Sequence, residues 1–199
     1  MGWPGEDAAV VEAQMINPAF YVFTGPMMGS KTTRLIALVD RFRYKCLKVL
    51  AFKPRLDDRY TESEICTHNG GKIPATNVSS GSDILRIVTQ QDSRPDVIAV
   101  DEAFMIDGVA DALISLYRTG FTVVVASIEM SASCNVFPEI KEILPWATRV
   151  EKCSAVCTTC GADAYFTARK VDNIEEIAVG GAELYEPRCW NHHNRVQDF

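Results

Sequence analysis

The chain has 199 residues, of which 47% are hydrophobic and 23% charged, with a formal net charge of −6 at pH 7. This composition is typical of a globular protein with one sizeable core. The acidic balance argues against a nucleic-acid binder, which normally carries a basic stripe. No apolar run approaches the roughly 20 residues that a membrane span needs. We therefore expect neither nucleic acid nor a membrane as partner.

Strands and helices alternate after a short leader. We expect residues 1–17 to be loosely held. Apolar runs predict strands at 19–23, 47–52, 96–100 and 121–126, and helical patterning predicts helices at 31–44, 82–91, 107–118 and 138–144. This alternation predicts an α/β domain over 18–150, with a parallel sheet flanked by helices. From Cys153 onward the sequence is rich in cysteines and short polar turns, which predicts a small C-terminal module over 151–195.

A phosphate-binding loop is predicted between the first strand and the first helix. Lys31 would reach the outer phosphates of ATP, and the Thr32 hydroxyl would ligate Mg²⁺. The sixth motif position holds Ser30 in place of glycine, and Gly29 stands one place earlier. A glycine-rich turn without a nucleotide is the alternative interpretation. The predicted nucleotide-binding residues are Gly25, Pro26, Met27, Met28, Gly29, Ser30, Lys31, Thr32 and Thr33.

Two carboxylates follow the buried strand at 96–100. Asp101 suits the role of holding Mg²⁺, and Glu102 suits that of a general base. Ligands of α/β sheets gather at the carboxyl ends of the strands. We therefore expect Lys31 and Asp101 at the tips of adjacent strands, holding one triphosphate between them. A strand that ends in a solvated acidic turn is the alternative.

Paired cysteine and histidine residues predict a zinc site near the C-terminus. Two residues separate Cys157 from Cys160, and the same spacing recurs at Cys189 and His192 after 28 intervening residues. Four sulfur and nitrogen donors suit tetrahedral Zn²⁺. His193 could replace His192, although the spacing favours His192. Two disulfides or scattered core cysteines are the alternatives. An odd count of seven cysteines and no visible signal peptide favour a reducing compartment, the cytoplasm.

Together these motifs resemble the zinc-containing thymidine kinase family over nearly the entire chain. The resemblance rests on segments 25–33, 57–60, 155–160, 167–169 and 180–189. It implies a P-loop NTPase-like sheet with a zinc-ribbon-like module, and transfer of the ATP γ-phosphate to the 5′-hydroxyl of thymidine with Mg²⁺. It also implies a deoxynucleoside as substrate and a homotetramer as assembly.

The resemblance extends to individual residues. It implies that Lys31, Arg59 and Glu102 are catalytic, and that a loop rooted on the zinc site closes over the base. Two aromatic positions of the family's pocket are Met105 and Ala132 here, which suggests a relaxed pyrimidine pocket. The implied nucleoside-binding residues are Met27, Met105, Ile128, Phe137, Thr167, Val179, Gly180, Gly181 and Tyr185.

Two rival functions share some of these motifs. A P-loop ATPase or switch without a nucleoside acceptor would use Lys31, Thr32 and Asp101 in the same way. A zinc-ribbon nucleic-acid-binding module attached to an inactive nucleotide fold is the other, and the acidic net charge weighs against it.

Overall fold

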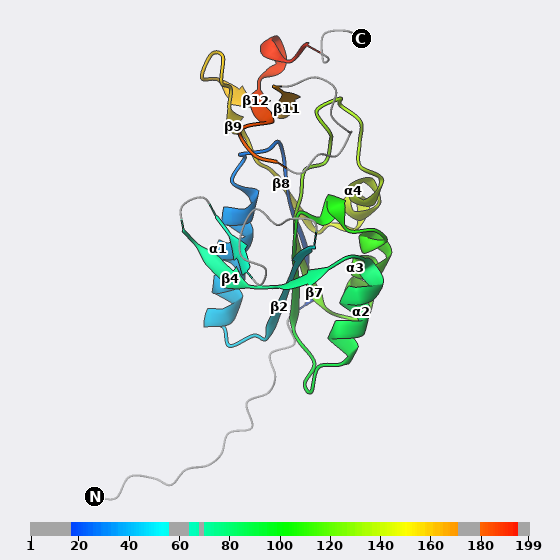
Figure 1. The fold of residues 1–199 in the computed structure, drawn as a ribbon. Helices are drawn as coiled ribbons and strands as arrows, with labels where there is room; N and C mark the ends of the chain where they lie inside the picture. The colour runs from blue at the N-terminus through cyan, green and yellow to red at the C-terminus, as the bar shows by residue number, and fades with distance from the viewer. Residues whose placement is uncertain (1–16, 56–63, 68–69, 171–179, 195–199) are drawn as a thin grey trace, which may run out of the picture.

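A parallel β-sheet forms the centre of the molecule. The computed structural model describes residues 17–55, 64–67, 70–170 and 180–194 (Figure 1). Six parallel strands lie in the order β5-β2-β6-β7-β1-β8. The strands are β1 Phe20–Thr24, β2 Val49–Pro54, β5 Thr76–Val78, β6 Val97–Asp101, β7 Thr122–Ala126 and β8 Arg149–Lys152. The predicted α/β class with a parallel sheet is confirmed, and β5 and β8 were not predicted.

Helices cover both faces of this sheet (Figure 1). One face packs on α1 (Lys31–Tyr44), through core residues such as Leu35 and Val39, and on the hairpin β3 (Glu64–Cys66) and β4 (Lys72–Pro74). The opposite face packs on α2 (Gly81–Thr89), α3 (Val109–Arg118) and α4 (Pro138–Ile143). Strands β6 and β7 are buried along their whole length, which explains their β-branched, apolar sequences.

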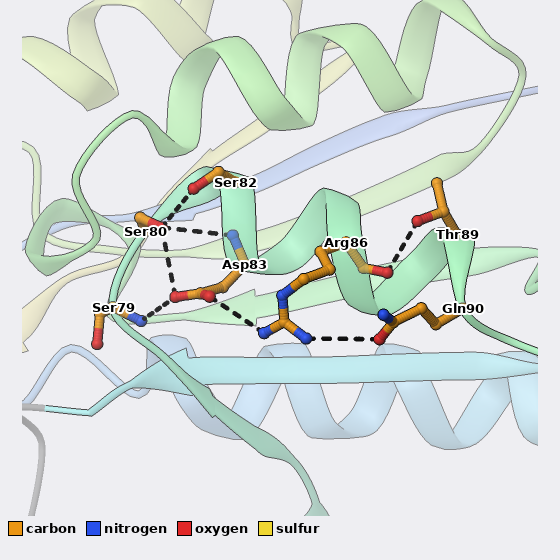
Figure 2. Close-up of polar contacts among 7 residues, drawn as sticks. All are labelled: Ser79, Ser80, Ser82, Asp83, Arg86, Thr89 and Gln90. Atoms are coloured by element: carbon orange, nitrogen blue, oxygen red, sulfur yellow. Dashed lines mark hydrogen bonds and ion pairs between the residues drawn. The ribbon is translucent and has the colours of Figure 1, made fainter.

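The start of α2 is set by a polar network around its first turn (Figure 2). Ser80 is the N-cap, and its hydroxyl accepts a hydrogen bond from the Asp83 N–H at 3.3 Å. The Asp83 carboxylate accepts from the Ser79 N–H at 3.1 Å and pairs with Arg86 at 3.2 Å. These interactions, with the Ser79 bond first, lower the pKa of Asp83. The cap therefore starts the helix at Gly81, one residue before the predicted boundary.

The C-terminal module consists of two short antiparallel hairpins and a 3-10 turn. The hairpins are β9 (Ala155–Val156) with β10 (Asp163–Ala164), and β11 (Phe166–Arg169) with β12 (Tyr185–Arg188). The turn covers Trp190–His192. The cluster of buried apolar residues within the module is small, namely Ala155, Cys157, Ala164 and Cys189. So little apolar burial predicts that metal ligation contributes much of the module's stability.

Candidate active site and metal centre

The predicted phosphate loop connects β1 to α1 in a tightly constrained conformation. Gly25 has a φ of +129°, and a Cβ at this position would lie 2.2 Å from the Cys153 carbonyl oxygen. Met28 and Ser30 have φ values of 63° and 57°, in the left-handed region. A non-glycine residue there costs roughly 1–2 kcal/mol. Ser30 therefore occupies, with strain, the conformation that glycine at the sixth motif position would adopt freely.

Lys31 is buried at the first position of α1. Its ammonium donates a hydrogen bond to the Pro26 carbonyl oxygen at 2.6 Å. Burial lowers the pKa of Lys31, and the negative charges of Glu102 and Asp101 oppose that shift. The lysine and both acidic residues therefore act on one another electrostatically.

Thr32 and Asp101 come together at the carboxyl end of the sheet. The Thr32 hydroxyl lies 3.1 Å from each carboxylate oxygen of Asp101. The prediction that Lys31 and Asp101 lie at the tips of adjacent strands is wrong, because β7 lies between β1 and β6. The first turn of α1 reaches across that gap to bring Thr32 to Asp101. A hydroxyl beside a carboxylate offers the hard oxygen donors that Mg²⁺ prefers, so the residues fit the ion.

Glu102 follows β6 directly and is half-buried. Its backbone is left-handed, with φ of 50°, and it precedes the 3-10 turn Ala103–Met105. Its charge acts on Lys31, so its carboxylate belongs to the same electrostatic cluster. The structure thus brings Lys31, Thr32, Asp101 and Glu102 together.

Sequence reasoning missed Glu129, which holds the start of the phosphate loop. Its carboxylate accepts hydrogen bonds from the Gly25 N–H at 2.7 Å and from the Thr24 hydroxyl, and it pairs with Lys152 at 2.9 Å. Burial favours a higher pKa for Glu129, but the bonds from Thr24 and Lys152 outweigh burial and lower the pKa. An acidic residue three positions beyond a predicted strand was the available signal.

Lys53 was also missed. It lies in β2 and is only 2% exposed. Ala51 of β2 pairs with Ala99 of β6, and both belong to the core cluster beneath α1. Side chains two residues apart in a strand lie on the same face of the sheet. Lys53 and Asp101, each two residues further along, are therefore neighbours on the face that packs on α1. The signal in the sequence was a lysine directly after the apolar run 49–52.

The four predicted zinc ligands converge in the C-terminal module. The donor atoms of Cys157, Cys160, Cys189 and His192 all lie within 4.8 Å of one another. Their backbone comes from the turn after β9 and from the 3-10 turn after β12, where the His192 N–H donates to the Cys189 carbonyl oxygen at 3.1 Å. Three sulfur donors and one imidazole nitrogen match tetrahedral zinc, so this cluster could hold Zn²⁺.

Electrostatics favour the same assignment. Burial alone would raise the pKa of the Cys157 thiol, but backbone hydrogen bonds from Cys189, Thr159 and Cys160 lower it to about 6. A thiolate is the form that binds metal. The His192 Nδ1 atom lies 3.2 Å from the Cys189 sulfur, whereas His193 contacts Thr167 and lies outside the ligand cluster.

The structure describes all of the predicted nucleoside-binding residues except Val179. Met27, Ile128 and Phe137 pack in one apolar cluster, and the Met27 N–H donates to the Thr167 hydroxyl at 3.0 Å. Met105 is half-buried, and Ala132 is buried. A hollow between the sheet and the C-terminal module is lined by Gly25, Pro26, Glu129, Met130, Ser131, Tyr165, Phe166 and Thr167.

The closing loop is described only in part. The N–H of Tyr185 donates to the Gly181 carbonyl oxygen at 3.0 Å, so the end of this loop turns back on itself. Gly180 precedes that turn, while Val179 and the predicted catalytic Arg59 lie outside the described residues.

The fold and the site define an α/β protein with a parallel sheet and a C-terminal Cys₃His cluster that could hold a metal ion. A family model described as thymidine kinase matches residues 19–193 of the chain. The chain therefore belongs to the thymidine kinase family, and this membership places it among the kinases. Among the described helices, none is both long and apolar enough to cross a membrane.

Proposed function

We propose that the chain transfers the γ-phosphate of ATP to the 5′-hydroxyl of thymidine or a closely related deoxynucleoside. The observation that carries the proposal is the contact of Thr32 with Asp101 beside the buried Lys31. Lys31 would supply the positive charge, and Thr32 and Asp101 the oxygen donors for Mg²⁺, that phosphoryl transfer requires at the end of a phosphate loop. Membership of the thymidine kinase family supports the choice of acceptor.

Each residue of the cluster has a distinct role in this proposal. Lys31 neutralises charge on the outer phosphates, and Thr32 and Asp101 hold Mg²⁺, which stabilises the charge that develops on the transferred group. Glu102 accepts the proton of the acceptor hydroxyl. Arg59 adds a positive charge near the phosphates. The Pro26 carbonyl, which now accepts from Lys31, orients the ammonium along the loop.

In this proposal the nucleoside binds where the phosphate loop meets the C-terminal module, beside the small hollow that Thr167 lines. Thr167 accepts from the Met27 N–H of the phosphate loop, and the turn at Gly180, Gly181 and Tyr185, with Val179, closes over the base. Backbone groups of the closing loop read the base edge. Glycines give such a loop the backbone freedom that closure needs.

The base pocket is proposed to be relaxed towards larger pyrimidines. Met105 and Ala132 stand where the family usually has aromatic residues. Methionine still covers a base face, and alanine removes the bulk of a ring. Phe137, with its ring 4.7 Å from that of Phe104, remains as an aromatic wall. We expect 5-substituted deoxyuridines larger than thymidine to be phosphorylated as well.

The test is a coupled assay with Mg²⁺-ATP and a panel of deoxynucleosides. ADP release that depends on thymidine, and is lost in Asp101→Asn, supports the proposal. ATP hydrolysis that is indifferent to every nucleoside would establish the rival ATPase. Turnover of thymidine alone, with none of its larger analogues, would exclude the relaxed pocket. A gel-shift with DNA and RNA tests the nucleic-acid-binding rival, for which we expect no shift.

The assembly is proposed from family membership, and the compartment from the odd count of seven cysteines, which favours a reducing environment. We propose a homotetramer that works in the cytoplasm. Light scattering on the purified chain measures the assembly directly, and a mass of one or two chains would refute the tetramer.

A further inference from the structure

The phosphate loop is held from outside by the C-terminal module. In the phosphate loop, Met28 and Ser30 have left-handed backbone conformations. Strained backbone of this kind persists where surrounding contacts hold it in place. One such contact is the Met27 N–H on the Thr167 hydroxyl of β11, at 3.0 Å. We propose that His193 is a positioning residue that fixes Thr167, and through Thr167 the phosphate loop, so that the metal centre sets the geometry of the ATP site. This inference rests on the proposed ATP-binding role of the loop.

His193 is built into the interior beside the metal centre. The residue is 2% exposed, and its Nε2 atom lies 3.0 Å from the Thr167 carbonyl oxygen. A carbonyl oxygen only accepts, so Nε2 carries the hydrogen and donates it. The Nδ1 atom lies 4.0 Å from the Cys134 sulfur, and the ring centroid lies 5.5 Å from that of Phe166. Contacts on several sides therefore hold the imidazole in one orientation.

The strand register leaves the Thr167 carbonyl available to His193. The Lys170 N–H donates to the Leu184 carbonyl oxygen, so the facing pair one step inward, Arg169 with Tyr185, is a non-hydrogen-bonded pair. Pairs alternate along an antiparallel ladder, so Thr167 with Pro187 is also non-hydrogen-bonded. The Thr167 carbonyl therefore points away from β12, and His193 supplies a donor that the ladder does not.

Thr167 thus connects two parts of the molecule through two different atoms. Its carbonyl oxygen is held by His193, and its hydroxyl holds Met27 in the phosphate loop. His193 follows the predicted ligand His192 directly in the chain, so ligation of His192 would fix the backbone from which the His193 ring projects. Loosening this connection should free the loop and weaken ATP binding without removing any group that contacts ATP.

The experiment compares His193→Phe with His193→Gln. Phenylalanine keeps a ring beside Phe166 but has no donor, whereas glutamine places an N–H near the position of Nε2. Zinc content and thermal unfolding are measured first, to show that both variants retain the module. Binding of a fluorescent ATP analogue is then measured without nucleoside, and hydrogen exchange is followed over residues 25–30.

We expect His193→Phe to weaken binding of the analogue about fivefold and to speed exchange in the loop, the effect of losing one buried hydrogen bond. His193→Gln should stay within about twofold of the unchanged chain. Thr167→Val, which removes the acceptor for Met27, should have the effect of His193→Phe, and the double variant should be no worse than either single variant, because both act through one connection.

Three results would overturn the inference. The first is His193→Phe with zinc retained, normal affinity and normal loop exchange. The second is His193→Gln as impaired as His193→Phe, which would assign the effect to packing. If His193→Phe loses zinc, the Thr167→Val variant is used to test the connection instead. The third result is then a Thr167→Val variant with normal affinity for the analogue and normal exchange in the loop. Failure of the unchanged chain to bind the analogue would refute the proposed function, and the exchange rates would still decide on the connection.

Discussion

Replacing Ser30 by glycine should stabilise this protein. Ser30 precedes α1 with φ of 57° and ψ of 26°, and its side chain makes no capping hydrogen bond. It is also exposed, so its hydroxymethyl group contributes little packing. Glycine adopts this conformation without strain, whereas serine pays roughly 1–2 kcal/mol. In the folded state, the only large change on substitution is therefore the relief of backbone strain.

The expected size follows from two opposing terms. Relief of strain stabilises the folded state, while the extra freedom of glycine stabilises the unfolded state by about 0.5–1 kcal/mol. The net gain in the free energy of unfolding is about 0.5–1 kcal/mol, which raises Tm by about 1–4 °C for a chain of this size. Affinity for ATP should be kept, because the backbone conformation of the loop is unchanged.

Two control variants make the assay decisive, with thermal unfolding followed by calorimetry. Ser30→Ala keeps the left-handed strain and should leave Tm unchanged. Ala37→Gly places glycine at an exposed position inside α1 and should destabilise by about 1 kcal/mol. A Ser30→Gly variant with a Tm equal to or below that of the unchanged chain would refute the reasoning, and so would equal stabilisation by Ser30→Ala.

Three further predictions address the chemistry and the metal. Glu102→Gln should spare ATP binding and slow turnover at least about 10²-fold, as loss of a general base does; unchanged single-turnover rates would show that Glu102 is not the base. Cys157→Ser should lower the zinc content and the thermal stability of the chain, and metal analysis that finds unaltered zinc would discredit the ligand assignment. Glu129→Gln should change the acid dependence of stability. The folded pKa of Glu129 lies below its ordinary 4.5, so its contribution is present above about pH 4.5 and is lost as pH falls through the folded pKa. The gap in unfolding free energy between the two proteins, measured by urea titration, should therefore close below pH 4.5, and a gap that widens would contradict the assigned interactions.

Local patterns predicted the elements that carry strong signals. The span of α1, 31–44, matches the structure, because the phosphate motif marks its start and apolar periodicity marks its face. The strands at 96–100 and 121–126 were found within one residue because burial on both faces makes them continuously apolar. By contrast, β8 is largely exposed at the sheet edge and carries charges, and β5 has only three residues. Neither strand therefore shows, in the sequence, the continuous apolar run by which a buried strand is recognised.

The candidate site was predictable where its residues stand in recognisable sequence motifs. It was not predictable where a residue matters only through contact with a distant segment. The spacing of Cys157, Cys160, Cys189 and His192 identified a cluster that the structure brings together. The order of the strands is a long-range property, so the separation of β1 from β6 by β7 could not be read from either strand. The same holds for Glu129, whose importance follows only from its contact with Gly25, 104 residues away.

The most direct test of the central proposal follows the phosphate itself. The chain is incubated with γ-labelled ATP and thymidine, with and without Mg²⁺, and the products are separated. The convergence of Lys31, Thr32 and Asp101 predicts label on the 5′-oxygen of thymidine, dependent on Mg²⁺ and lost in Asp101→Asn. Label released only as inorganic phosphate, at a rate unaffected by thymidine, would contradict it.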